Sequence, residues 1–193
     1  MLVVYSHEPN IYNECMRLYL ARHTQTNYNV LGLANANPSV DVHLTQLGIN
    51  QAEALSQALQ DKPFDAIYIS QLPRTRQTAD IINRNHGKEL IVDARLNDNR
   101  TGYEDKPARD WIEALDNSAD RWNAVFNDGE SLQHAADRAR DFIEDLRKSG
   151  HKAVIVVTHG FITKAIYAYL NALPLEEADS CDLVQGTFAE FQI

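Results

Sequence analysis

The sequence predicts an α/β fold in which helices cover both faces of a central, mostly parallel β-sheet. Two observations support this class: short apolar segments alternate with longer segments whose apolar residues recur at helical spacing, and the 193 residues fit a single domain. Parallel strands are joined by crossover helices, which pack on the two faces of the sheet. We therefore expect a three-layer αβα sandwich around one sheet.

The first half of the chain predicts three strands and two helices. The elements are, in order, a strand over 17–21, a helix over 45–60, a strand over 64–70, a helix over 75–85 and a strand over 90–94. The strands are short and rich in aliphatic, β-branched and aromatic residues, as in the segment FDAIYIS. The helices carry apolar residues three and four positions apart. Residues 27–43, which are rich in asparagine, predict a loop.

The second half predicts three helices and two strands. They are, in order, a helix that begins at Pro107, a helix after Ser131, a strand over 153–158, a helix over 161–170 and a strand over 187–193. Pro107 suits the first turn of its helix. Four apolar residues would then share one side of that helix: Trp111, Leu115, Trp122 and Phe126. The next helix has Ser131 as its expected N-cap, a continuous apolar stripe, and Gly150 after its end.

The charge balance is acidic, with 18 Lys and Arg against 27 Asp and Glu and a formal charge of −9. Nucleic acids and anionic membranes attract basic surfaces, so we expect neither as a partner. Cys15 and Cys181 are too few for a disulfide framework and lack metal-binding spacing. Because no apolar run reaches the length of a membrane span, we expect a cytoplasmic protein with reduced thiols.

Four predicted strands lead into chemically capable side chains at their carboxyl ends. These groups are Arg22 with His23, Ser70 with the following Arg74, Asp98, and Thr158 with His159. Each residue alone has an ordinary structural explanation, such as a hydrogen-bonded histidine or a turn-forming aspartate. Ligands of open α/β sheets bind at this edge, so the shared position favours one common site. The seven histidines lack HxH or HExxH spacing, and we expect no metal.

Six segments of the chain match known motifs in register. They are LARHTQT at 20–26, LTQLG at 44–48 with QA at 51–52, SQLPRTRQTA at 70–79, LND at 96–98, GES at 129–131 and THG at 158–160. Together they resemble the signatures of the histidine phosphatase superfamily, the phosphoglycerate mutase-like proteins of branch 1. The resemblance implies a phosphoglycerate mutase-like fold over 16–193 and leaves 1–15 as an N-terminal extension.

The resemblance implies a site centred on His23. This residue would attack phosphorus as a neutral imidazole and become a phosphohistidine, which water then hydrolyses. Arg22, Arg74 and His159 would bind the phosphoryl oxygens, because guanidinium groups match phosphate geometry. The remaining residues expected to bind substrate are Asn29, Glu130, Ser131 and Gly160.

The family supplies a carboxylic acid that protonates the leaving alcohol, and Asp98 stands at that position. It is one methylene shorter than the usual glutamate, and Glu104 in the same loop is a rival. Two further departures lie close to the nucleophile. Thr24 replaces the usual glycine and adds a side chain near the phosphate pocket, and Phe161 narrows the entrance.

The function expected from these residues is that of a phosphatase acting on a phosphomonoester. Mutases of the family are longer and enclose their substrate more fully, which favours a phosphatase for this short chain. A phosphoglycerate mutase-type transferase is the alternative. A non-catalytic phosphate-binding module is a third possibility. We expect a small phosphorylated substrate and no cofactor, with specificity residues in 27–43 and 97–127. The sequence makes no prediction of oligomeric state.

Overall fold

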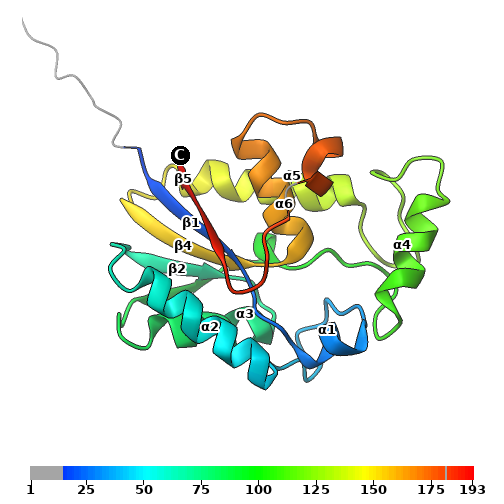
Figure 1. Ribbon diagram of the computed structural model, residues 1–193. Coiled ribbons are helices and arrows are strands. Elements are labelled where there is room, and N and C mark those ends of the chain that lie inside the picture. Colours follow the sequence, from blue (N-terminus) through cyan, green and yellow to red (C-terminus); the bar gives the residue numbers. More distant parts are fainter. Residues whose placement is uncertain (1–14, 181) are drawn as a thin grey trace, which may run out of the picture.

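A computed structural model describes residues 15–180 and 182–193, which place one sheet between two layers of helices (Figure 1). Five strands form the described sheet: β1 (Arg17–Arg22), β2 (Ala66–Ile69), β3 (Glu89–Val92), β4 (Ala153–Thr158) and β5 (Phe188–Gln192). Their order is β3-β2-β4-β1-β5, and only β5 runs antiparallel to its neighbour. The predicted α/β fold is confirmed. Of the extension expected over 1–15, only Cys15 is among the described residues. Cys181 lies outside them.

Four helices cover the sheet in two pairs. They are α2 (Gln46–Leu59), α3 (Pro73–Asn83), α5 (Leu132–Leu146) and α6 (Gly160–Leu170). Leu18 and Leu20 of β1 pack in one core with α5 and α6. Tyr19 and Ala21 point to the opposite face and pack with α2 and α3. This alternation along one strand produces the three layers that Figure 1 shows.

The register of β1 against β4 sets the edge where the site lies. Arg22 pairs with Thr158 at the carboxyl ends of the two parallel strands. The next backbone hydrogen bond joins the His23 amide to the Thr158 carbonyl at 2.8 Å. His23 and His159 therefore leave the sheet side by side.

α2 and α5 begin after residues whose side chains satisfy free backbone amides. The Thr45 side chain accepts a hydrogen bond from the Gly48 amide at 3.0 Å, and Ser131 accepts one from the His134 amide at 3.1 Å. Ser131 is therefore the N-cap of α5, as predicted. α3 begins at Pro73, two residues before the predicted start, because proline tolerates the first helical turn.

The helix predicted from Pro107 through Phe126 is wrong in length. α4 (Ala108–Asp116) ends at its C-cap Asn117, so Trp122 and Phe126 lie beyond it. The Asp120 carboxylate accepts hydrogen bonds from the Trp122 and Asn123 amides. Side chains that bind nearby amides in this way compete with helical hydrogen bonds, and the apolar spacing alone did not reveal it.

The stretch 27–43, predicted as a loop, contains a short helix. α1 (Asn27–Leu31) starts with a capping box between Thr26 and Asn29, and it ends at Gly32 with a φ of 67°. Glycine adopts this left-handed conformation without strain. α1 therefore depends on local capping more than on burial, since none of its residues is buried.

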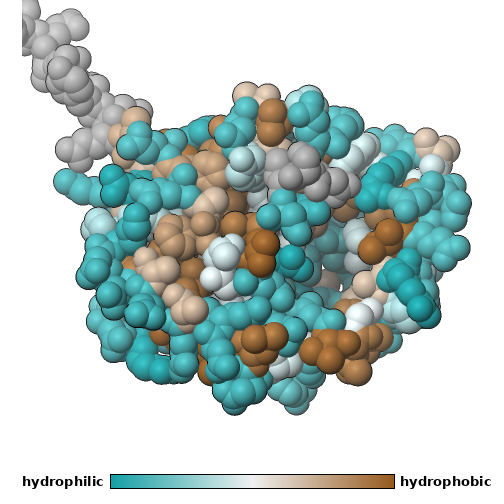
Figure 2. All heavy atoms as spheres, in the orientation of Figure 1, coloured by the Kyte–Doolittle hydropathy of each residue, from teal (hydrophilic) through white to brown (hydrophobic). Residues whose placement is uncertain are grey.

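The surface over α1 carries an apolar patch, where Val30 and Leu31 are each 65% exposed (Figure 2). Most of the face shown around it is hydrophilic, in keeping with 23% charged residues. Among the described residues, no helix is both long and apolar enough to cross a membrane.

Candidate active site

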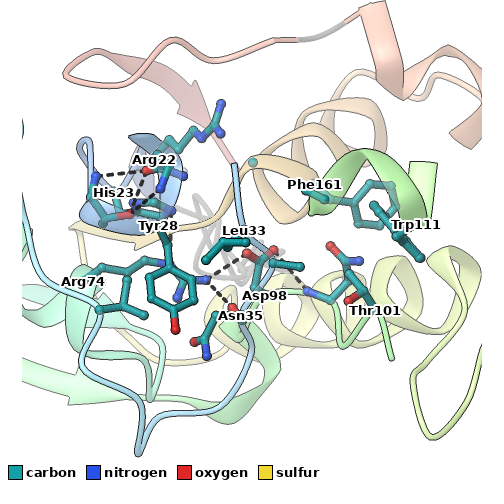
Figure 3. A pocket seen from close by; sticks show the side chains of 17 residues that line it. Arg22, His23, Tyr28, Leu33, Asn35, Arg74, Asp98, Thr101, Trp111 and Phe161 are labelled. Atoms are coloured by element: carbon teal, nitrogen blue, oxygen red, sulfur yellow. Dashed lines mark hydrogen bonds and ion pairs between the residues drawn. The ribbon is translucent and has the colours of Figure 1, made fainter. Parts of the chain in front are cut away.

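A cavity of about 250 Å³ lies at the carboxyl edge of the sheet, where four of the predicted groups meet (Figure 3). β1 delivers Arg22 and His23, and the first turn of α3 delivers Arg74. The loop after β3 delivers Asp98. His159 is the N-cap of α6 and lies against His23, with the ring centroids 5.1 Å apart. Because α3 and α6 both begin here, their positive dipole ends favour an anion.

His23 has the protonation state that a nucleophile needs. The side chain is 3% exposed, and its Nδ1 lies 2.9 Å from the Thr24 carbonyl oxygen, so Nδ1–H is the donor. This hydrogen bond leaves the lone pair on Nε2, which accepts from Arg74 Nε at 3.3 Å. Burial and then the Arg74 charge lower the pKa of His23 well below 6.5, against the opposing effect of the Thr24 carbonyl. The ring is therefore neutral.

Arg74 donates hydrogen bonds to most of the polar groups of the site. Its Nε is shared between His23 Nε2 at 3.3 Å and His159 Nδ1 at 3.2 Å. Its Nη2 donates to Asp98 Oδ2 at 2.9 Å and to the Asn35 carbonyl at 3.0 Å. The side chain is 5% exposed, so a buried cation lies in contact with His23, His159 and Asp98.

His159 is held as a neutral imidazole by the residues beneath it. Its Nε2–H donates to Ser70 Oγ at 2.8 Å, and Ser70 Oγ lies 2.9 Å from Thr75 Oγ1. Burial lowers the pKa of His159 well below 6.5, followed by the charge of Arg74. Ser70 therefore orients His159 rather than facing the cavity.

Arg22 lies against the first residue of α6. A Cβ built on Gly160 would be 3.1 Å from Arg22 Cζ, so the glycine permits this close approach. Arg22 Nη1 is 3.8 Å from Asp182 Oδ1, a partly exposed pair. The buried Nε has no hydrogen-bond partner among the described residues. Arg22 and Gly160 thus form one wall of the cavity.

The structure separates the two candidate acids. Asp98 lines the cavity, with Oδ2 3.6 Å from His159 Nδ1. Glu104 instead accepts hydrogen bonds from the Ala36 amide at 2.5 Å and from Thr101 Oγ1 at 3.4 Å. It is not part of the cavity lining. Only Asp98 is placed to reach a group bound beside His23.

Asn29, Glu130 and Ser131 differ in their distance from this centre. Asn29 lines the cavity, but its Oδ1 already accepts from the Thr26 amide at 3.0 Å. Glu130 and Ser131 are outside the lining. Glu130 binds Arg138 Nη2 at 2.8 Å, and Ser131 caps α5. Both side chains thus bind other parts of the protein and lie away from the cavity, where we expected them to bind substrate.

Thr24 and Phe161, the two departures from the family pattern, behave differently. Thr24 is fully buried and turns toward Thr78 of α3, with the two hydroxyl oxygens 3.3 Å apart. Its side chain therefore does not enter the cavity. Phe161 does line the cavity, next to Trp111 in Figure 3.

Sequence reasoning missed several residues of the cavity wall. The apolar ones include Leu33, Val42 and Trp111, and the polar ones include Asn35 and Asn99. All lie in the two stretches 27–43 and 97–127, where we expected specificity residues but named none of these five for that role. Within the described ranges, no group of three or more His, Cys, Asp or Glu residues could hold a metal ion.

Comparisons with known proteins agree with this geometry. A family model described as the histidine phosphatase superfamily (branch 1) matches residues 18–193. The adenosylcobalamin/alpha-ribazole phosphatase of Salmonella typhimurium is 30% identical over 185 residues, covering 92% of this chain and 91% of that protein. The metal-independent phosphoserine phosphatase of Arabidopsis thaliana is 30% identical over 177 residues, covering 84% and 72%.

A solved structure shares the fold over nearly the same length. The alpha-ribazole phosphatase of Shigella flexneri superposes with a TM-score of 0.81 at 27% identity. The match covers 92% of this chain and 91% of that one. The phosphoglycerate mutase-like architecture expected from the motifs is thereby confirmed.

Proposed function

The chain belongs to the histidine phosphatase superfamily (branch 1), and from this premise we propose that it is a phosphatase that hydrolyses a phosphomonoester through His23. One observation carries the proposal: a neutral His23 whose unprotonated Nε2 faces the Arg74 guanidinium at the wall of the cavity. A neutral imidazole is a nucleophile, and a neighbouring cation stabilises the charge that develops on a phosphoryl group.

In the first step, the His23 Nε2 lone pair forms a bond to phosphorus while the bond from phosphorus to the ester oxygen breaks. Arg22 and Arg74 bind the equatorial oxygens and neutralise their charge. The phosphate dianion favours protonation of His159 on Nδ1, which then becomes a donor to a phosphoryl oxygen. The Thr24 carbonyl keeps accepting from His23 Nδ1–H as the ring becomes cationic.

Asp98 supplies the proton that the leaving oxygen needs. In the unliganded arrangement its Oδ2 accepts from Arg74 and its Oδ1 from the Asn99 amide at 3.1 Å, so it is held as a carboxylate. A phosphoryl group that takes the Arg74 donors releases Oδ2 to carry a proton. After the alcohol leaves with that proton, Asp98 accepts one from the attacking water. The water oxygen bonds to phosphorus as the bond from phosphorus to His23 Nε2 breaks, which releases inorganic phosphate and free His23.

The test is turnover of p-nitrophenyl phosphate by His23→Ala beside the wild type. We expect the wild type to be active with a chelator present and the variant to lose at least about 10³-fold in kcat. His43→Ala is the matched control, because that side chain is 53% exposed and lies outside the cavity lining. Rapid quenching with labelled substrate should trap an acid-labile, base-stable phosphoenzyme in the wild type alone. Full activity of His23→Ala, or activity that depends on an added metal, would contradict the proposal.

A further inference from the structure

Two buried amides in the cavity wall have polar atoms without partners. Asn35 is 9% exposed and Asn99 is 7% exposed. Within the described part of the chain, Asn35 Oδ1, Asn35 Nδ2 and Asn99 Nδ2 make no hydrogen bond. Both residues line the cavity that holds His23 and Arg74.

Such groups are uncommon, because a buried amide that gives up water without gaining a partner destabilises the fold. Neither side chain is needed for local structure. The bond that joins Asn35 to Arg74 uses the Asn35 backbone carbonyl, and the Asn99 backbone amide binds Asp98. These atoms have almost no accessible surface, so a ligand would bind them after the amides turn toward the cavity that both residues line.

The position of the two amides indicates which part of the ligand they would contact. Asn99 follows Asp98 directly, and Figure 3 shows Asn35 beside the Arg74–Asp98 pair. Asp98 must reach the leaving oxygen if it is the acid. The alcohol portion of the substrate would then lie beside Asp98, in the cavity that Asn35 and Asn99 also line.

The charged residues of the cavity wall limit which charged groups that alcohol can have. Apart from His23, which is neutral, the ionisable residues with charge at neutral pH in the described lining are Arg22, Arg74 and Asp98. Both arginines are required by the phosphoryl oxygens. A second acidic group on the alcohol would find no further cation in the described lining to balance its charge, because both arginines already bind the phosphoryl group.

We propose that Asn35 and Asn99 bind the leaving alcohol and select a neutral, hydroxylated one, as in a polyol or sugar phosphate. Amide groups donate to and accept from hydroxyls, and Trp111 and Leu33 supply apolar wall for the carbon skeleton. This selection rests on the proposed phosphatase function. It would distinguish the substrate of this chain from acidic phosphoesters such as phosphoglycerate.

Three phosphoesters of similar size test the selection: glycerol 3-phosphate, n-propyl phosphate and 3-phosphoglycerate. We expect kcat/KM to be highest for glycerol 3-phosphate, at least about tenfold above n-propyl phosphate, because two hydroxyls gain hydrogen bonds. We expect 3-phosphoglycerate to be the poorest of the three. A preference for 3-phosphoglycerate would overturn the proposal and would favour the neighbouring hollow lined by Arg121 and Lys164 as an anion site.

Asn35→Leu and Asn99→Leu separate recognition from structure, and Asn50→Leu on the exposed side of α2 is the matched control. Each cavity variant should reduce the glycerol 3-phosphate to n-propyl phosphate ratio several-fold toward one. Its Tm should not fall below that of the wild type, because no protein hydrogen bond is lost. An equal loss on both substrates, or a lowered Tm with the ratio unchanged, would overturn the proposal.

The failure of this inference is distinguishable from failure of the proposed function. Turnover of p-nitrophenyl phosphate with no preference among the three alcohols would reject the role of the amides alone. Absence of any turnover, with His23 intact, would reject both.

Discussion

At the scale of single residues, Arg74 connects the resting site to the reacting one. Its Nη2 holds Asp98 at 2.9 Å, and its Nε faces both histidines. A bound phosphoryl group competes for the same donors. The proposed mechanism therefore couples substrate binding to release of the acid through one guanidinium group, which a lysine with a single point charge could not reproduce.

The acid role of Asp98 is tested by Asp98→Asn. The variant should slow n-propyl phosphate by about 10²-fold or more, since an alkoxide needs a proton to leave. It should slow p-nitrophenyl phosphate far less, because that leaving group departs without a proton. Steady-state kinetics on both esters measure the difference, with Glu104→Gln as the control. Equal losses on the two esters for Asp98→Asn would show that Asp98 supports binding instead.

The two buried histidines also predict how stability depends on pH. Both pKa values are lowered well below 6.5, so the folded chain binds fewer protons than the unfolded chain just below that pH. The contribution of the two histidines to the free energy of unfolding is therefore complete above about pH 6.5. Below that pH the free energy of unfolding falls by about 1.4 kcal/mol per pH unit for each histidine.

Urea unfolding between pH 7.5 and 5 measures this slope. His159→Asn should reduce the slope of the free energy of unfolding against pH by the contribution of one histidine, whatever it does to stability at pH 7.5. Exposed His43 serves again as the control, since His43→Asn should leave the slope as it is. A slope unchanged by His159→Asn would mean that the imidazole is protonated in the folded protein.

At the scale of elements, α5 holds the loop that carries Asp98. Arg138 of α5 donates to the Arg95 carbonyl at 2.6 Å and to the Asp98 carbonyl at 3.2 Å. Glu130 binds Arg138 and also accepts from the Arg100 amide at 3.0 Å. Burial raises the pKa of Glu130, but the hydrogen bond and charge of Arg138 outweigh it and lower the pKa overall. This ion pair positions the loop on both sides of Asp98.

Arg138→Ala should therefore affect both stability and chemistry. Loss of the guanidinium removes the arginine partner of the largely buried Glu130, which keeps the Arg100 amide and His134, and we expect about 3 kcal/mol less free energy of unfolding. Turnover of n-propyl phosphate should fall more than turnover of p-nitrophenyl phosphate, because the displaced loop carries the acid. Arg140→Ala, on the exposed side of the same helix, is the control.

The double variant Glu130→Gln with Arg138→Met separates the two effects. Removing the buried carboxylate along with the guanidinium should restore much of the stability. The n-propyl phosphate rate should remain low, since the contacts to the Arg95 and Asp98 carbonyls are still missing. Recovery of that rate together with stability would show that Arg138 acts on stability alone.

At the scale of the whole molecule, Met16 joins the start of the domain to its last residue. The Met16 amide donates to the Ile193 carbonyl at 2.9 Å, and the Ile193 amide donates back at 2.8 Å. The Met16 side chain is 4% exposed and belongs to the core with α5 and α6. The pairing of β1 with both neighbouring strands thus needs no residue before Met16.

A chain that begins at Met16 should accordingly fold and work. We expect its Tm to lie within about 4 °C of the full chain, the shift that 1 kcal/mol produces at this size, and its kcat/KM on p-nitrophenyl phosphate to be unchanged. Calorimetry and kinetics on the two chains make the comparison. A chain that begins at Tyr19 is the control, because it removes part of the β1 register and should not fold. Unfolding of the Met16 chain would show that 1–15 contribute to the domain.

The sequence by itself determined the order of strands and helices and the edge at which the site would lie. These features depend on local signals: apolar runs for β1 and β4, a capping serine for α5, and polar groups just after each strand. The helix predicted from Pro107 failed where Asp120 binds neighbouring amides, a competition that apolar spacing does not report.

Only the tertiary structure showed that Asp98 lines the cavity and Glu104 does not. It also paired Glu130 with Arg138 and brought Asn35 and Asn99 to the cavity wall. The pairs involved are separated by tens of residues along the chain, and a single contact between distant residues leaves no periodic pattern. A buried amide without a partner becomes visible only when every neighbour that could have bound it is in place. The proposed chemistry at the phosphoryl group follows from motifs, whereas the proposed choice of alcohol depends on how two loops pack.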